Sequence, residues 1–289
     1  MLRFAACQYA IPLCESWDDY AAHLRALAGD AADAGAQLLL LPEYAAMALT
    51  GLLPPDERGD LHRSIADIQP LIPHWLTLCE AIAREHEVHF CPGSAPVLDA
   101  DGIYRNRAFL FGPQGLLGHQ DKLIMTRFER EQWFIGAGTQ GLRVFETPLG
   151  RLGILICYDN EFPMLARRLA EQGVDLILAP SCTDTQAGAH RVRIGAQARA
   201  LENQFAVLVS PTAGLAPWSP AVDENFGRAA LYVPSDYGMP PDGVFAQSDE
   251  IFCAESRWLY GEIDLGHVAA LRTGGQVALF RDWPEQFDI

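Results

Sequence analysis

The sequence predicts a layered α/β domain, and two observations support this prediction. Short apolar runs of strand length alternate with amphipathic, helix-like stretches along the whole chain, as expected where strands are connected through helices. The run at 152–156, Leu-Gly-Ile-Leu-Ile, is apolar throughout, like a strand buried on both faces. No composition shift or flexible linker divides the 289 residues. We therefore expect one domain over 1–289, with 266–289 as a C-terminal tail.

Helices are expected where apolar residues recur every three or four positions. The first covers about 20–31, and Gly35 supplies its stop. In the last expected helix, at 188–203, Ile194, Ala198 and Leu201 are expected to face inward and the arginines outward. The further expected helices cover residues 68–82, 161–172 and 188–203.

Strands are expected where apolar runs are bounded by turn residues, as at Gly112-Pro113-Gln114-Gly115. The segment 213–227 is rich in Pro, Gly and polar residues and is expected to be the longest irregular loop. The expected strands cover residues 2–9, 37–41, 88–92, 103–111, 115–121, 142–146, 152–156, 174–179, 205–210, 228–233, 243–247 and 256–264.

Charge and cysteine content exclude several classes of function. The formal net charge of −16, without any basic run, disfavours nucleic acid and anionic membrane surfaces as partners. The seven cysteines contain no C-x-x-C pair, which favours free thiols in a reducing cytoplasm over a disulfide framework. Residues 1–7 read as a first strand and not as a signal peptide. No apolar stretch approaches the roughly 18 residues of a membrane helix, so we expect a cytoplasmic protein.

Cys157 is the first candidate for chemistry, because it directly follows the strand at 152–156. Asp159 or Asn160 then offers an N-cap oxygen, and Pro163 suits a first helical turn. The sulfur is therefore expected on a sharp turn at the carboxyl end of a strand, where a helix N-terminus lowers the pKa of a thiol. The alternative is a buried structural cysteine, which is common among free thiols.

Two other strand exits offer groups that assist a thiol. Glu43 follows the apolar run that starts at Leu38, where desolvation raises a carboxyl pKa toward the range useful for proton transfer. Lys122 follows another strand, and Glu129 lies seven residues beyond it. A buried lysine near developing negative charge stabilises an oxyanion, whereas most lysines and loop acids are solvated. These fragments taken singly leave both interpretations open.

In this order and at these spacings, the three fragments resemble the nitrilase superfamily of carbon–nitrogen hydrolases. The matching motifs are LLLLPEY around Glu43, KLIMTRFER from Lys122, and GILICYDNEFP around Cys157. The resemblance includes DLILAPS and ARALEN further along, and covers about residues 2–265. The TRFER and RVRIGAQARALENQ segments are most similar to a sparsely characterised bacterial branch.

The resemblance implies a Glu–Lys–Cys catalytic set. Cys157 would attack a carbonyl or nitrile carbon to form a thioester acyl-enzyme, with Glu43 as general base and acid. Lys122 and the backbone N–H of Tyr158 would stabilise the oxyanion, and Glu129 would orient Lys122 or contact substrate. The implied reaction is hydrolysis of a small amide, less often a nitrile, with no cofactor and no metal.

Substrate choice does not follow from the resemblance. The segments 119–121 and 182–184 depart from the pattern of many relatives, and both are expected to line the pocket. Tyr44, Tyr158 and Thr183, which adjoin the motif residues, are the candidate substrate-binding side chains.

The resemblance also implies a four-layer α-β-β-α sandwich and a homodimer or higher homo-oligomer, often with the C-terminal tail reaching the partner. Two other functions remain open. One is acyl transfer through the same thioester to an acceptor other than water. The other is a non-catalytic binding or scaffold protein that retains the fold.

Other constellations are weaker. His86-Glu87-Val88-His89 lacks the H-E-x-x-H spacing of a zinc site, so metal binding is not expected. A Cys–His protease dyad with His119 or His190 lacks any papain-like or caspase-like signature around Cys157. Without a glycine-rich phosphate loop, nucleotide binding is not expected either.

Overall fold

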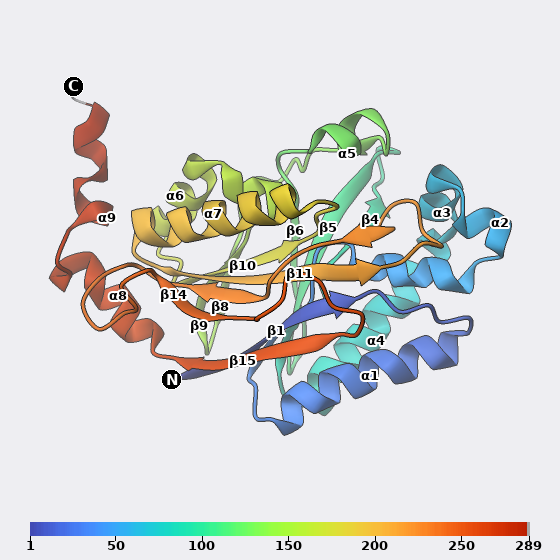
Figure 1. Cartoon of the computed structure of the whole chain (residues 1–289), viewed down its shortest axis with the longest axis horizontal. Helices are drawn as coiled ribbons and strands as arrows, with labels where there is room; N and C mark the ends of the chain where they lie inside the picture. Colours follow the sequence, from blue (N-terminus) through green and yellow to red (C-terminus); the bar gives the residue numbers. More distant parts are fainter. Residues whose placement is uncertain (288–289) are drawn as a thin grey trace.

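The computed structural model describes residues 1–287 and is a four-layer α-β-β-α sandwich (Figure 1). Two sheets lie face to face at its centre. Helices α1 (Trp17–Asp33) and α4 (Ile72–Glu85) cover the outer face of the first sheet. Helices α6 (Pro163–Glu171) and α7 (Gln186–Asn203) cover the outer face of the second.

The first sheet is arranged around β1 (Leu2–Ala10). Its other strands are β2 (Leu38–Leu40), β3 (His89–Cys91), β4 (Ser94–Leu98), β5 (Tyr104–Gly112), β6 (Gly115–Asp121), β7 (Ile135–Gly136) and β15 (Arg257–Ile263). The strands β1, β2 and β3 are parallel, and β15 closes one side antiparallel to β1. Because β5 is antiparallel to both β3 and β6, β6 runs in the same direction as β1, β2 and β3.

The second sheet is formed by strands from the other half of the chain. They are β8 (Val144–Thr147), β9 (Gly150–Ile154), β10 (Leu176–Ser181), β11 (Ala206–Leu215), β12 (Glu224–Asn225), β13 (Ala230–Tyr232) and β14 (Val244–Gln247). The strands β9, β10 and β11 are parallel, and β11 also pairs in parallel with the end of β1 at Tyr9 and Ala10. The strands β2, β6, β9 and β10 therefore all end at the same end of the sandwich.

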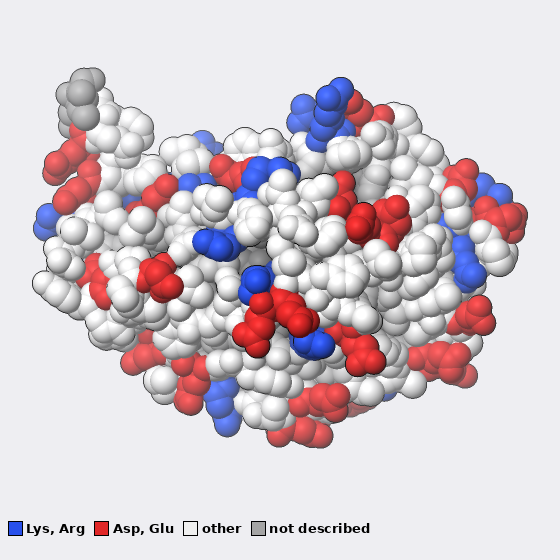
Figure 2. All heavy atoms as spheres, viewed as in Figure 1, with Lys and Arg blue, Asp and Glu red and all other residues white. Residues whose placement is uncertain are grey.

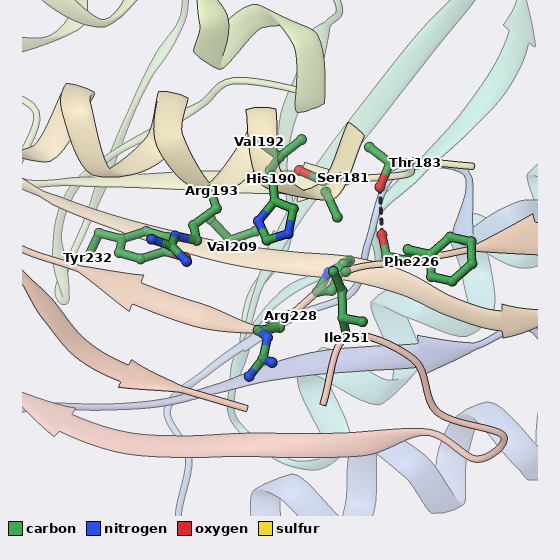
Figure 3. A pocket seen from close by; sticks show the side chains of 13 residues that line it. Ser181, Thr183, His190, Val192, Arg193, Val209, Phe226, Arg228, Tyr232 and Ile251 are labelled. Atoms are coloured by element: carbon green, nitrogen blue, oxygen red, sulfur yellow. Dashed lines mark hydrogen bonds between the residues drawn. The ribbon is translucent and has the colours of Figure 1, made fainter. Parts of the chain in front are cut away.

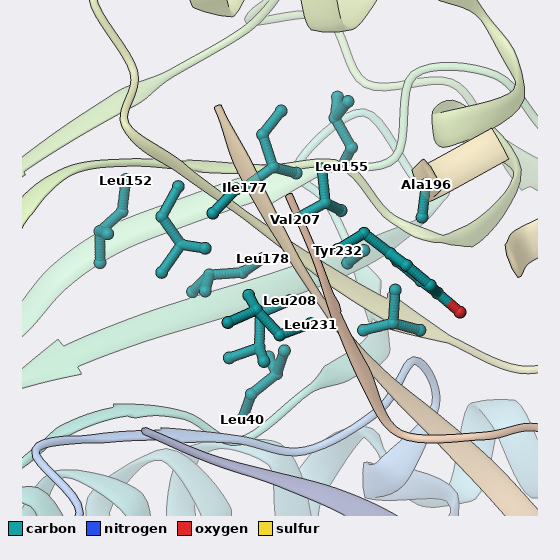
Figure 4. Close-up of a cluster of buried hydrophobic side chains, with 14 of the residues drawn as sticks. Leu40, Leu152, Leu155, Ile177, Leu178, Ala196, Val207, Leu208, Leu231 and Tyr232 are labelled. Atoms are coloured by element: carbon teal, nitrogen blue, oxygen red, sulfur yellow. The ribbon is translucent and has the colours of Figure 1, made fainter. Parts of the chain in front are cut away.

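Successive side chains of a strand point to opposite faces of its sheet, so each strand contributes to two layers of the core. In β1, Phe4 and Ala6 face the second sheet, whereas Ala5 and Cys7 face α1 and α4. The apolar side chains between the two sheets and beneath α7 belong to one cluster (Figure 4). Leu152, Leu178 and Leu208 in that cluster are fully buried, which explains why these strands are apolar on both faces.

The remaining elements are short, and most lie outside the expected segments. They are η1 (Ala45–Leu52), α2 (Pro55–Arg58), α3 (Leu61–Asp67), η2 (Gln69–Leu71), α5 (Arg127–Glu131), η3 (Cys157–Glu161), α8 (Leu265–Gly274), α9 (Leu279–Asp282) and η4 (Trp283–Phe287). The expected helix at 68–82 is in fact η2 followed by α4, because Pro70 and Pro73 each occupy a first helical turn. The expected irregular loop at 213–227 is partly strand, since β11 extends to Leu215 and pairs with β12.

The predicted inner face of α7 is wrong, although Arg191 and Arg193 are exposed as expected. Ile194 is 61% exposed and Leu201 is 40% exposed, whereas Arg199 is only 5% exposed. The inner face consists of small residues because α7 packs closely on η3: a Cβ on Gly195 would lie 3.1 Å from the carbonyl oxygen of Asn160. The guanidinium of Arg199 donates to that same oxygen at 3.0 Å, so this arginine supports the turn that contains Cys157.

The predicted N-cap after Cys157 is also wrong. The chain first forms the 3₁₀ turn η3, so α6 begins at Pro163 with Phe162 in the cap position and no side-chain cap. The freed carboxylate of Asp159 instead accepts hydrogen bonds from the backbone N–H groups of Leu123 and Ile124, the latter at 2.9 Å. Asp159 therefore ties the turn that contains Cys157 to the segment directly after Lys122.

The C-terminal segment packs against the second sheet. Val268 and Leu271 of α8 are buried, and Phe280 packs on the same core. Arg167 of α6 lies 4.6 Å from the ring centre of Phe280 and 5.3 Å from that of Trp283. Among the helices of residues 1–287, none combines the length and the apolar character needed to span a membrane.

The environment of Asp159 predicts how stability depends on pH. Burial raises the pKa of Asp159 from 3.8 to about 7, against the Lys122 charge and the two backbone N–H donors that lower it. The folded state therefore binds a proton that the unfolded state has lost, so this group's contribution to stability falls as pH rises toward 7. Between pH 5 and 8, the free energy of unfolding of the parent should fall by about 2 kcal/mol relative to Asp159→Asn.

Chemical denaturation of both proteins at a series of pH values measures this difference. The asparagine oxygen can still accept from Leu123 and Ile124, so the variant should fold. Asp33→Asn, which removes an exposed aspartate on α1, is the control and should follow the parent. If the free energies of unfolding of the parent and of Asp159→Asn change equally with pH, Asp159 is ionised throughout.

Candidate active site

The shared end of the sandwich brings Glu43, Lys122 and Glu129 into one buried cluster. The Nζ of Lys122 lies 2.7 Å from Oε1 of Glu43 and 2.6 Å from Oε2 of Glu129. The side chains of Glu43, Lys122 and Glu129 are 2%, 1% and 4% exposed. One ammonium is therefore held between two carboxylates, away from bulk water.

Cys157 adjoins this cluster through the residue that follows β10. The backbone N–H of Cys182 donates to Oε2 of Glu43 at 2.9 Å, while its carbonyl oxygen accepts from Sγ of Cys157 at 3.5 Å. The thiol also lies near enough to the Glu43 carboxylate to act on the pKa of Glu43. The ends of β2, β9 and β10 thus hold the carboxylate and the sulfur at one place.

Glu129 is fixed by its position in a short helix. It is the N3 residue of α5, where it forms a reciprocal capping box with Thr126. The Oε1 atom of Glu129 accepts from the hydroxyl of Tyr44 at 2.8 Å and from Nδ2 of Asn106 at 3.0 Å. All of these donors hold the carboxylate toward Lys122.

Two residues of the site have left-handed backbone conformations, which are uncommon outside glycine. Cys157 has φ 48° at the start of η3, and Tyr44 has φ 57° directly after Glu43. In both cases the chain turns sharply as it leaves a strand. The sharp turn at Cys157 that the sequence predicts is therefore present, although β9 itself ends three residues earlier at Ile154.

Burial and mutual charge shift the pKa values within the cluster. Burial raises the pKa of Glu43, against the lowering effect of Lys122, and repulsion from Glu129 adds to the rise. Burial also raises the pKa of Glu129, but Lys122 and the hydrogen bonds outweigh it, so that pKa lies below its ordinary value. Burial lowers the pKa of Lys122, yet the two carboxylates raise it well above its ordinary value. The ammonium stays charged, and Glu43 is the carboxylate that takes up a proton more readily.

The thiol of Cys157 differs from the expectation. Burial and the negative charge of Glu43 raise its pKa well above the ordinary value, and Lys122 only partly opposes them. The predicted lowering by a helix N-terminus is wrong, because the residue begins a short 3₁₀ turn and α6 starts six residues later. The resting thiol is protonated and has a carboxylate beside it.

The cluster lies at the base of a pocket of about 560 Å³. Tyr44, Tyr158 and Thr183, the predicted substrate-binding residues, all line it. The hydroxyl of Tyr44 is bonded to Glu129, and the hydroxyl of Thr183 donates to the carbonyl oxygen of Phe226 at 2.5 Å. These two side chains therefore present their other atoms to the pocket.

Of the two divergent segments, only 182–184 lines the pocket. The segment 119–121 lies behind it in β6. There Asp121 pairs with Arg107 at 2.6 Å, and Gln120 donates to the carbonyl oxygen of Gly141 at 2.9 Å. The expectation that 119–121 contributes to the pocket is wrong, because its side chains are used in packing β6.

Sequence reasoning missed Asn106, which joins the two carboxylates. Its Nδ2 lies 2.8 Å from Oε1 of Glu43 and 3.0 Å from Oε1 of Glu129, and the residue is fully buried. The available signal was an asparagine within the expected strand 103–111, on the same face as the apolar Ala108 and Leu110. Asp159 and the backbone of Cys182 were missed as well, because their roles depend on segments distant in the chain.

The histidines considered earlier for a metal site or a protease dyad lie apart from this site. Across residues 1–287, no three His, Cys, Asp or Glu side chains come together in a way that could hold a metal ion. His119 is on β6, packed near Phe109, and His190 lines a separate small cavity under α7. Neither histidine lines the pocket that contains Cys157.

Comparison with known proteins identifies the family of this chain. A family model described as carbon-nitrogen hydrolase matches residues 3–237. The protein named Probable hydrolase YhcX, from Bacillus subtilis, is 32% identical over 281 residues, which are 97% of this chain and 53% of that protein. This chain thus spans about half the length of that relative. An omega-amidase from Xenopus laevis is 29% identical over 204 residues, 68% of each chain.

The fold is found among solved structures too. The crystal structure of a carbon-nitrogen hydrolase from Helicobacter pylori G27 superposes with a TM-score of 0.75 and 20% sequence identity. The superposition covers 100% of this chain and 94% of that one. With the family model matching most of the chain, this protein belongs to the carbon-nitrogen hydrolase family.

Proposed function

We propose that the protein hydrolyses a small amide through a thioester on Cys157. The supporting observation is the buried arrangement of Lys122 between Glu43 and Glu129, beside the Cys157 thiol. A protonated thiol and an adjacent carboxylate of raised pKa are the pair needed to generate a nucleophile and keep its proton nearby.

In the first half of the proposed reaction, Glu43 takes the thiol proton as Sγ attacks the amide carbonyl carbon. The oxyanion is stabilised by the Lys122 ammonium together with the backbone N–H of Tyr158. Glu43 then gives its proton to the departing nitrogen, and ammonia or an amine leaves. The acyl group remains on Cys157 as a thioester.

In the second half, Glu43 removes a proton from a water molecule that attacks the thioester carbon. Collapse of the second oxyanion releases the carboxylic acid, and the thiolate regains a proton from Glu43. Lys122 keeps its charge throughout because two carboxylates raise its pKa. Glu129 acts as the orienting partner of Lys122 and does not exchange a proton.

The charged side chains of the pocket wall favour one class of amide. Arg191 pairs with Glu161 at 3.5 Å, and Arg127 pairs with Glu131 at 2.9 Å. Asp184 and Asp223 also line the pocket, and no ion pair joins either of them to another described residue. The protein as a whole is strongly acidic, and red acidic groups are spread over the face in Figure 2. We infer that amides with a positive or neutral distal group are preferred over anionic ones.

The proposed assembly and location rest on observations outside the site. We propose a homodimer, because Ile194 and Leu201 leave an apolar stripe exposed on the outer face of α7. We also propose a cytoplasmic location, which the seven unbonded thiols support. Sedimentation equilibrium of the parent and of Ile194→Asp tests the first proposal.

Replacement of the proposed nucleophile is the first test. Cys157→Ala should lose turnover and should form no covalent adduct when a mixture of amides is added and the intact protein is weighed. Cys79→Ala and Cys182→Ala are matched controls that should keep most of the activity, because only the backbone of Cys182 contacts the cluster. An active Cys157→Ala protein would require a different nucleophile.

Replacement of the second carboxylate tests the role of Glu129. Glu129→Gln should fold normally and keep KM within a few-fold of the parent, while kcat falls by roughly one to three orders of magnitude. Glu131→Gln, on the exposed side of the same helix, should behave like the parent. Equal turnover of Glu129→Gln and the parent from about pH 6 to pH 9 would contradict the orienting role.

A matched series of amides tests the preference for distal charge. Amides of equal length ending in an amine, a methyl or a carboxylate should decrease in kcat/KM in that order, by about tenfold overall at low salt. The double variant Asp184→Asn, Asp223→Asn should reduce the advantage of the amine, and Asp33→Asn should not. If the amide that ends in a carboxylate is turned over best, and Arg191→Gln loses this preference, Arg191 is instead an anion-binding group.

A further inference from the structure

A second cavity lies beside the segment 181–183 at the end of β10 and is chemically unlike the first. It has a volume of about 30 Å³, roughly the space of a single water. It is enclosed by the start of α7, by β11 and β13, and by the segment 226–228 (Figure 3). Its walls contain His190, Arg193 and Arg228 but no aspartate or glutamate, although the chain has 37 acidic and 21 basic residues.

Two of the donors around this cavity, the Arg193 guanidinium and the Tyr232 hydroxyl, have no acceptor among residues 1–287. Arg193 forms no ion pair with any carboxylate of residues 1–287, and Arg228 donates only to the backbone carbonyl oxygens of Ser248 and Asp249. Tyr232 is 1% exposed, and no hydrogen bond joins its hydroxyl to another described residue. Figure 3 shows its ring extending from β13 toward Arg193. This hydroxyl is not an enclosed polar atom without a partner, so it is accessible to water or to a bound group in the cavity.

The hydroxyl of Tyr232 remains a donor at any ordinary pH. Burial raises its pKa to about 12, although Arg193 and Arg228 act to lower it. Arg193 and the Tyr232 phenol therefore line a space of about one water, and Arg228 adds positive charge nearby while it donates to backbone carbonyls. Guanidinium groups are suited to carboxylate and phosphate oxygens.

We propose that this cavity binds one end of a small oxyanion, a carboxylate or a phosphate, whose remainder lies in solvent. The bound oxygen would accept from the Tyr232 hydroxyl and from Arg193. Because Ser181 and Thr183 line the cavity on either side of Cys182, the anion would contact the segment whose backbone holds Glu43 and Cys157. The site does not depend on the proposed amide hydrolysis.

Isothermal titration of the full chain with inorganic phosphate, and separately with acetate, tests this proposal at constant ionic strength with chloride as reference. The parent should bind one of the two oxyanions with millimolar or tighter affinity, and chloride more weakly. Arg193→Gln and Tyr232→Phe should each weaken binding by about tenfold or more. Arg168→Gln, which removes an exposed charge on α6, should bind like the parent.

Two variants keep the test decisive if one of them is damaged. Tyr232→Phe retains the buried ring, and Arg193 is exposed, so thermal unfolding without anion should be close to that of the parent. Binding that is equal in the parent, Arg193→Gln and Tyr232→Phe would show that the oxyanion binds elsewhere. No binding of phosphate or acetate to the parent would overturn the proposal.

Discussion

The site depends on one buried ammonium, that of Lys122, between two carboxylates. Removing three charges from water is costly, and the mutual attraction offsets this only when the geometry is good and the remaining hydrogen bonds are made. The structure supplies those bonds from distant parts of the chain: Asn106 from β5, Tyr44 after β2 and Thr126 before α5. Loss of Lys122 would leave two buried carboxylates without a counter-charge, whereas loss of one carboxylate would leave a single ion pair.

The two carboxylates differ because their surroundings differ. Glu129 accepts from several donors in addition to Lys122, whereas Glu43 shares one oxygen between Lys122 and Asn106 and has the thiol beside it. The pKa of Glu43 is raised and that of Glu129 is lowered. This separation is the usual physical sign of distinct proton-handling roles. In the proposed mechanism it would provide one base and one fixed counter-charge from the same residue type.

The sequence was sufficient for most strands, though not for β4, β7 and β12, and for the position of the three motif residues after strands, because apolar runs and local motifs are properties of contiguous segments. Asn106 could not be assigned, since its contacts are 63 and 23 residues away. The orientation of α7 failed for a related reason. Apolar Ile194 and Leu201 were expected inside, but the approach of the helix to η3 requires small residues such as Gly195 there, and no periodicity rule reports the distance between two elements.

At Cys157, the left-handed backbone conformation puts the needs of the proposed chemistry in conflict with those of stability. A non-glycine residue in this conformation costs about 1 kcal/mol, a strain that glycine would relieve and alanine would retain. An inactive glycine variant could therefore unfold at a higher temperature than the active protein. Stability alone would favour glycine at this turn, whereas the proposed reaction requires the sulfur.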